Sequence, residues 1–300
     1  MKTDILVTLL SWEDRYILGL EKNIQEYKPS KVLLFWYNTK STFEWKKENF
    51  KKTRELLADI LIEIEIDGTK PYENWFSFKD IFTKYCLNKN ILVDITTMTR
   101  EAIWLSLYNC KINFCRTSYI YYKPGLYSDD WISRDPDKPR LLYKMSGIAK
   151  LGAPTLLLVT AGYDPQRLDS LIYKFEPKHT MLFFHDGTDP RNRKNLTECE
   201  GLFKTKYNIE SVFEYHAYDV DASYNLITEK LRLMESESKL PYLDCCNIIL
   251  NSLGAKTSAI TLFKIWLKYP QVALSYIPSK EYNRDYSSGI GQAYSDEITF

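Results

Sequence analysis

The stretch from Ile91 to Ile103 constrains the fold of this chain more than any other. Three apolar residues lead into Asp94, a polar cluster follows, and apolar residues with helical spacing begin at Ala102. This order predicts a buried parallel strand, a tight polar loop and the first turns of a helix. Backbone N–H groups and hydroxyls beside a helix N-terminus stabilise anions. The same pattern also fits an ordinary capped strand–helix turn, because threonine is an acceptable N-cap.

A second stretch, residues 247–260, repeats that pattern far down the chain. An apolar strand reaches an amide side chain, a small polar loop follows, and an Ala-Ile pair opens a helix. Asp94 falls opposite Asn251, and Arg100 falls opposite Thr257.

Landmarks on either side of the two stretches recur in the same order. Each half begins with an apolar strand and an amphipathic segment, continues through a proline to a second strand, and has a further strand beyond the central stretch. The paired landmarks are Leu10 and Thr160, Pro29 and Pro177, Asn38 and Asp186, and Pro124 and Pro278. Such a long period predicts two copies of one α/β unit of roughly 130–150 residues each, and not a solenoid array.

Composition places the joint between the two copies. The segment after the first copy is rich in Pro, Gly, Asp and Arg, which is typical of a connection. We therefore expect unit 1 over residues 1–125, a connecting segment over 126–153 and unit 2 over 154–300. The last residues, 278–300, are expected to wrap back over the surface. Within unit 1, residues 40–60 predict an amphipathic helix with Lys46-Lys47 and Lys51-Lys52 on its solvated face.

The overall composition excludes several partners. The chain has 300 residues and a net charge of +1, so no overall field steers it to duplex DNA or to an anionic membrane. No apolar run reaches transmembrane length, and the N-terminus lacks the form of a signal peptide. Six scattered cysteines and three histidines do not have the spacing of a zinc site. We expect a cytoplasmic protein with no metal and no cofactor.

The candidate ligand site follows from the geometry of parallel sheets. Ligands bind outside the carboxyl ends of the strands, where the two central loops and the loops after both first strands are expected. Hydroxyl side chains and a cation at a helix start suit a phosphate or phosphodiester, and Trp or Tyr can stack on a base. We expect one shared cleft lined in unit 1 by Ser11, Trp12, Arg15, Asp94, Thr96, Thr97, Thr99 and Arg100, and in unit 2 by Gly162, Tyr163, Asn251, Ser252, Gly254, Lys256, Thr257 and Ser258.

Common catalytic motifs do not occur in the sequence. It has no GxxxxGK[ST], no GxGxxG after the first strand, no GxSxG and no HExxH. P-loop NTPases, dinucleotide oxidoreductases, hydrolases with a nucleophile elbow and zinc proteases are therefore disfavoured. His185 and His216 fall near predicted strand ends, where lone histidines are more often accommodated than catalytic.

The central loop carries a family resemblance. Its run Asp94-Ile95-Thr96-Thr97-Met98-Thr99-Arg100 resembles the D-x-T-G-G-T-K loop of CARF domains, the CRISPR-associated Rossmann-fold sensors of cyclic oligonucleotides. The run keeps the aspartate, two threonines and the basic end. It has Thr97 and Met98 where that family often has glycines.

The second copy departs further from that loop. It has Asn251 for the aspartate and Leu253 for a threonine, keeps Gly254, and has Lys256 and Thr257 in reversed order. Two fused units of this kind also resemble the SAVED domain of anti-phage signalling systems. The resemblance implies an α/β fold of two tandem Rossmann-like units, with mainly parallel sheets related by a pseudo-two-fold axis.

The resemblance also implies a function. It predicts a nucleotide-sensing regulatory protein of an anti-phage defence-type system, which binds a cyclic oligonucleotide or related nucleotide between the two units. The predicted units leave no residues for an effector domain, so we expect a protein partner to supply it. The alternatives are a metal-independent ring nuclease using Arg100 and Lys256, another nucleotide-processing enzyme, and a non-enzymatic interaction subunit of a defence complex.

Overall fold

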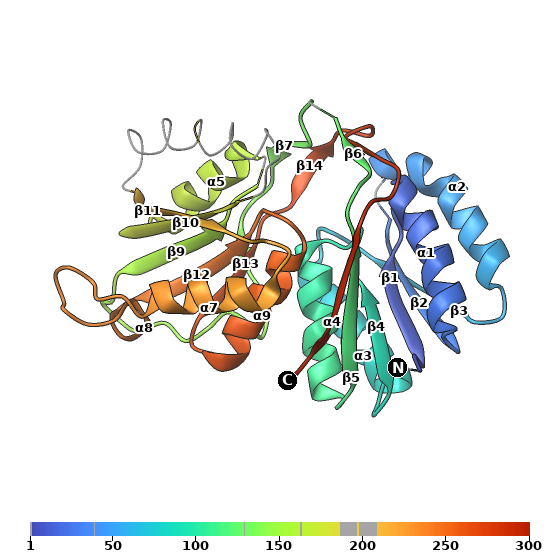
Figure 1. Ribbon diagram of the computed structural model, residues 1–300, viewed down its shortest axis with the longest axis horizontal. Helices are drawn as coiled ribbons and strands as arrows, with labels where there is room; N and C mark the ends of the chain where they lie inside the picture. The colour runs from blue at the N-terminus through green and yellow to red at the C-terminus, as the bar shows by residue number, and fades with distance from the viewer. Residues whose placement is uncertain (1, 39, 129, 163, 187–196, 198–208) are drawn as a thin grey trace. The chain divides into compact units, whose positions relative to one another are not determined.

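The chain forms two compact α/β units in a computed structural model that describes residues 2–38, 40–128, 130–162, 164–186, 197 and 209–300 (Figure 1). Unit 1 comprises Met1–Asp130 together with Asn283–Phe300, and unit 2 comprises Trp131–Tyr282. Each unit contains one six-stranded sheet. No helix in the described part of the chain is long and apolar enough to cross a membrane.

Unit 1 is built on the strand order β16-β5-β4-β1-β2-β3. Its five parallel strands are β1 (Ile5–Leu9), β2 (Lys31–Tyr37), β3 (Leu61–Ile66), β4 (Asn90–Asp94) and β5 (Arg116–Tyr122). The sixth strand, β16 (Ala293–Ile298), is antiparallel and lies at the edge beside β5. The helices are α1 (Asp14–Tyr27), α2 (Lys40–Leu57), α3 (Pro71–Tyr85) and α4 (Arg100–Ile112).

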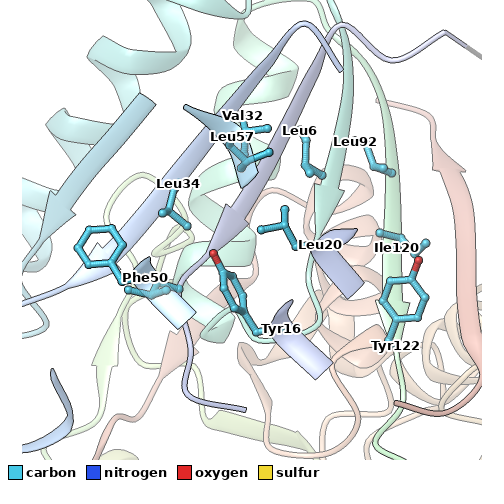
Figure 2. Packing of buried hydrophobic residues seen from close by; sticks show 11 residues of the cluster. Leu6, Tyr16, Leu20, Val32, Leu34, Phe50, Leu57, Leu92, Ile120 and Tyr122 are labelled. Atoms are coloured by element: carbon cyan, nitrogen blue, oxygen red, sulfur yellow. The ribbon is translucent and has the colours of Figure 1, made fainter. Parts of the chain in front are cut away.

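Helices bury both faces of this sheet, which is why the central strands are continuously apolar. Successive residues of β2 point to opposite faces. Leu34 joins Tyr16 and Leu20 of α1 in one core cluster, which Figure 2 shows from close by. Its neighbour Phe35 stacks on Phe78 of α3 with ring centroids 3.9 Å apart.

Unit 2 has the strand order β11-β10-β9-β12-β13-β8. Its parallel strands are β9 (Thr155–Thr160), β10 (His179–His185), β11 (Ile209–Tyr215), β12 (Asn247–Ser252) and β13 (Ala273–Tyr276), and β8 (Arg140–Leu141) is antiparallel at the edge. The helices in the described part of this unit are α5 (Pro165–Phe175), α7 (Val220–Leu231), α8 (Tyr242–Cys245) and α9 (Thr257–Lys268).

The two sheets match strand for strand. β4, which ends at Asp94, lies between β5 and β1, and β12, which carries Asn251, lies between β13 and β9. Each sheet also has one antiparallel edge strand beside its fifth parallel strand. The predicted α/β class with two mainly parallel sheets is confirmed. Their relation by a two-fold axis stays a prediction.

The boundaries of the two units differ from the predicted ranges at the C-terminal segment and at the connecting segment. Residues 283–300 belong to unit 1, because β16 pairs with β5 and β15 (Ser287–Ser288) pairs with β6 (Leu126–Tyr127). The expected connecting segment contributes to unit 2, where β7 (Ser133–Pro136) pairs with β14 (Ser279–Tyr282) and β8 pairs with β13. The segment that follows β5 therefore supplies β8, the edge strand beside β13. The segment that follows β13 supplies β16, the edge strand beside β5. Edge pairing satisfies backbone groups that an uncovered strand would leave open.

Removal of residues 290–300 should open the edge of β5. We expect the β5 amides that pair with β16 to exchange at least roughly tenfold faster, since their hydrogen bonds are lost. Hydrogen exchange followed by mass spectrometry measures this, with β12 of unit 2 as an internal reference. Unchanged protection of β5 in the shortened chain would contradict the pairing.

Candidate functional site

The loops after β1 and β4 are neighbours at the carboxyl edge of the unit 1 sheet. The two strands pair in parallel, with Leu6 beside Leu92. Beyond their ends, the Thr97 hydroxyl donates a hydrogen bond of 2.8 Å to the carbonyl of Leu9. The sequence-predicted convergence of these two loops therefore occurs within unit 1.

Asp94 organises the loop after β4 from inside the protein. Its side chain is buried, and its two oxygens accept hydrogen bonds from the Thr96 amide at 3.0 Å and the Asn23 amide group at 2.9 Å. The Thr96 hydroxyl accepts from the backbone N–H of Tyr122 at 3.0 Å. Asp94, Thr96 and Thr97 therefore use their side chains to hold the loop.

Thr99 and Arg100 occupy the start of α4 and are only half-buried. Thr99 is the N-cap, and its hydroxyl accepts from the Ala102 amide at 3.1 Å. The same hydroxyl lies 3.1 Å from the Tyr37 hydroxyl. The first amides of a helix have no partner inside the helix, so this end can bind an anion.

Arg15, in the first turn of α1, has its counter-charge in the loop just before this helix. Its guanidinium is buried, forms an ion pair of 2.7 Å with Glu13, and donates to the Tyr286 hydroxyl at 3.1 Å. The Ser11 hydroxyl lies 3.5 Å from the Glu13 carboxylate. Arg15 therefore binds the loop to the C-terminal segment of unit 1, and its charge is already compensated.

Trp12 keeps a half-buried indole at this edge. Its ring meets Trp45 edge to face with centroids 5.3 Å apart, and its N–H donates to the carbonyl of Arg284 at 3.0 Å. The two indoles offer the kind of flat surface on which a base can stack.

Lys46 is not among the candidate site residues predicted from the sequence. It was expected on the solvated face of its helix, but only 4% of the residue is exposed. Its neighbour Lys47 has the expected environment, with an exposed side chain paired to Glu44 at 2.7 Å. The missed signal is the spacing of Lys46 with the inward residues Phe50 and Thr53 along α2.

Lys46 lies beside the loop after β1. One turn further along the same helix face, the Asn49 side chain donates to the carbonyl of Ser11 at 2.9 Å. No carboxylate among the described residues pairs with the Lys46 ammonium, and burial lowers the pKa of this lysine from 10.5 to about 8. Unit 1 therefore places a buried, uncompensated cation at its loop edge.

The corresponding loops of unit 2 are packed against each other by two glycines. A Cβ atom on Gly162 would lie 2.2 Å from the carbonyl oxygen of Leu253, and one on Gly254 would lie 2.8 Å from that of Ala161. These glycines therefore allow the loops after β9 and β12 to touch. Tyr163, the predicted stacking residue, lies outside the described residues.

Most polar side chains of the unit 2 loops also bond internally. Ser258 lies 2.8 Å from the Ser252 hydroxyl and 3.0 Å from that of Thr160, and Asn251 donates to the carbonyl of Ser275 at 2.9 Å. The Thr257 hydroxyl donates to the carbonyl of Ala217. All of these predicted residues are buried, whereas Lys256, just before α9, is half-buried. The prediction that the loops of both units line one cleft stays a prediction.

Comparison with known proteins supports the fold. No family model matches the chain, and no curated protein matches it. A type III CRISPR defence DNA nuclease activated by cyclic oligoadenylate is similar over 87% of this chain and 63% of its own, with 10% identity and a TM-score of 0.51. Can2 from Sulfobacillus thermosulfidooxidans, in complex with cyclic tetra-adenylate, matches 39% of this chain and 31% of its own, with 18% identity and a TM-score of 0.30. The chain thus spans less than two thirds of either structure. The first likeness shows a shared fold over most of the chain.

Replacing Glu13 by Gln should destabilise unit 1 by about 3–5 kcal/mol, because it leaves the Arg15 charge buried without its partner. The matched control is Glu63→Gln, which breaks the more exposed pair with Arg54 and should cost less than about 1 kcal/mol. Urea unfolding at neutral pH gives both free energies. Similar losses in the two variants would contradict a buried role for Arg15.

Proposed function

We propose that the chain is a nucleotide sensor whose loop edges bind a phosphate-bearing ligand, most specifically a cyclic oligonucleotide. The contacts in unit 1 are Lys46, Thr99, Arg100 and the first amides of α4, with a base against the Trp12 ring. Lys256 and the backbone at Gly254 are the equivalent contacts in unit 2. The system is of the anti-phage defence type, and a separate protein partner carries the response.

The observation that carries this proposal is the burial of Lys46 with no counter-charge among the residues that the structure describes. Holding its pKa near 8 instead of 10.5 costs the folded protein roughly 3 kcal/mol at neutral pH. An anion bound at the loop edge would offset that cost through charge-assisted hydrogen bonds. The neighbouring Arg15 cannot serve in this way, since Glu13 already neutralises it.

The matching sheets support a tandem duplication. Six strand positions agree in order, and the loops after β1 and β4 have counterparts after β9 and β12. A duplicated unit gives two similar phosphate-binding edges in one chain, which suits a ligand that carries several phosphates. The fold shared with a nuclease activated by cyclic oligoadenylate is consistent with such a ligand.

Binding should depend on Lys46 and not on its neighbour. We expect Lys46→Met to weaken binding of cyclic oligoadenylates by roughly ten- to a hundredfold, through loss of one charged hydrogen bond. Lys47→Met is the matched control and should bind as the wild type does, because Lys47 is exposed and paired with Glu44. Calorimetry with cyclic di-, tri-, tetra- and hexa-adenylate measures the affinities, and mass spectrometry of the same samples detects any cleavage.

Arg100→Ala and Lys256→Ala complete the series, and each should weaken binding by a similar factor. If the wild type binds none of the ligands, the sensor proposal fails. If the substitutions at Lys46, Arg100 and Lys256 all leave the affinity unchanged, the ligand binds elsewhere on the protein. Cleavage products would identify the protein as a ring nuclease.

The same Lys46→Met substitution should stabilise the free protein. Between about pH 8 and 10.5 the unfolded chain holds the Lys46 proton and the folded chain has released it, so wild-type stability gains from rising pH in this window. We expect the variant to gain roughly 1–3 kcal/mol at pH 7 and to lose that pH-dependent gain. Urea unfolding at pH 7 and at about pH 9.5 tests this. A destabilised variant at pH 7 would contradict the uncompensated charge.

A further inference from the structure

A second cluster of functional groups lies at the carboxyl ends of β10 and β11 in unit 2. β10 ends at His185, Asp186 follows it directly, and His216 follows the last residue of β11. The two strands are parallel neighbours, with His185 beside Tyr215, so their ends coincide. One ligand atom from each of the three residues lies within 4.8 Å of the other two.

The spacing of these atoms suits a metal ion. The Nδ1 atoms of His185 and His216 lie 3.3 Å and 3.1 Å from the same carboxylate oxygen, Oδ1 of Asp186. Zinc bonds of 2.0–2.1 Å in a tetrahedral arrangement separate neighbouring ligand atoms by about 3.3 Å. Two imidazoles and one carboxylate are also the donor types that zinc and similar transition metals prefer.

The backbone fixes the protonation of one ligand. The backbone N–H of Ala217 donates a hydrogen bond to Nδ1 of His185, with the two nitrogens 3.2 Å apart. This hydrogen bond fixes Nδ1 as the unprotonated nitrogen of the ring. A metal ion bound at Nδ1 takes the place of the Ala217 amide, because the nitrogen has only one lone pair. The His185 ring is also held edge to face against Tyr218, with centroids 4.9 Å apart, and the Asp186 amide donates to the carbonyl of Tyr215 at 3.0 Å.

The fold itself does not require these side chains. In unit 1 the equivalent backbone bond joins the amide of Asn38 to the carbonyl of Ile66 at 3.3 Å. There the Asn38 side chain donates to Glu65, and the neighbouring Tyr37 contacts Thr99. The strand ends of unit 1 thus close without imidazoles, and the histidine pair is an addition specific to unit 2.

We propose that His185, Asp186 and His216 bind one divalent transition-metal ion, with Zn²⁺ as the best-fitting ion and a water molecule in its fourth position. The ion joins the ends of β10 and β11 and adds a positive centre at the loop edge of unit 2. The spacing of cysteine and histidine in the sequence predicted no zinc site. That argument fails here because two neighbouring strands bring together residues 31 positions apart.

Zn²⁺ titration of the full chain, stripped of metal with a chelator and dialysed, tests the site. We expect one ion per chain by calorimetry, and visible absorption bands of a four-coordinate complex when Co²⁺ replaces Zn²⁺. His216→Ala and Asp186→Asn should each weaken binding by about a hundredfold or more. Zn²⁺ should also raise the unfolding temperature of the wild type and leave that of His216→Ala unchanged.

Two controls separate this site from other zinc ligands. Cys245→Ser with Cys246→Ser removes the vicinal thiols, whose sulfurs lie 3.6 Å apart, and should leave Zn²⁺ binding intact. Asp67→Asn changes the residue after β3, the unit 1 counterpart of His216, and should also leave it intact. The proposal is overturned if the wild type binds no Zn²⁺, or if the cysteine variant loses binding and His216→Ala keeps it. The side chain of His216 is 57% exposed, so this variant should fold, which its circular dichroism spectrum checks.

Discussion

The structure depends on how buried parallel strands satisfy their polar groups where they end. Inside each sheet the backbone is paired strand to strand, but at the carboxyl edge the last carbonyls and the first helix amides need other partners. In unit 1 the Thr97 hydroxyl bonds to the carbonyl of Leu9, and Asp94 bonds to the Thr96 amide. In unit 2 the Ser258 hydroxyl bonds to those of Ser252 and Thr160, and the Gly254 amide donates to the carbonyl of Thr160. These bonds fix the loops rigidly, and a rigid edge presents helix amides in one arrangement.

The two buried cations at this edge differ in whether a carboxylate neutralises them, and we use this difference to distinguish a structural residue from a functional one. Arg15 and Glu13 cancel each other in a buried pair. Lys46 is also buried, and no carboxylate in the described part of the chain pairs with it, so the folded protein retains a desolvation cost that a bound anion would offset. Sites that bind ligands often carry such a cost in the free state. In this chain the residue that carries the desolvation cost is Lys46 of α2, and not a residue of the threonine-rich loop after β4.

Sequence patterns predicted the fold better than the site. Apolar runs before Asp94 and Asn251 identified the central strands because burial on both faces leaves little choice of residue. Hydroxyl side chains in the loops looked equally available, but those of Thr96, Thr97 and Ser258 bond to Tyr122, Leu9 and Thr160, which lie in distant segments. The edge strand β16 was also missed, since only Ile298 of its six residues is buried and its sequence reads as polar. Both failures concern contacts between residues far apart in the chain.

The central claim is that the loop edge of unit 1 binds a phosphate-bearing nucleotide. Hydrogen exchange of the full chain with and without cyclic tetra-adenylate tests it most directly. We expect slower exchange in residues 11–15 and 95–101 and in the turn of α2 around Lys46, with a smaller change in the same segments of Lys46→Met. No change in these segments at saturating nucleotide, or protection confined to other parts of the chain, would contradict it.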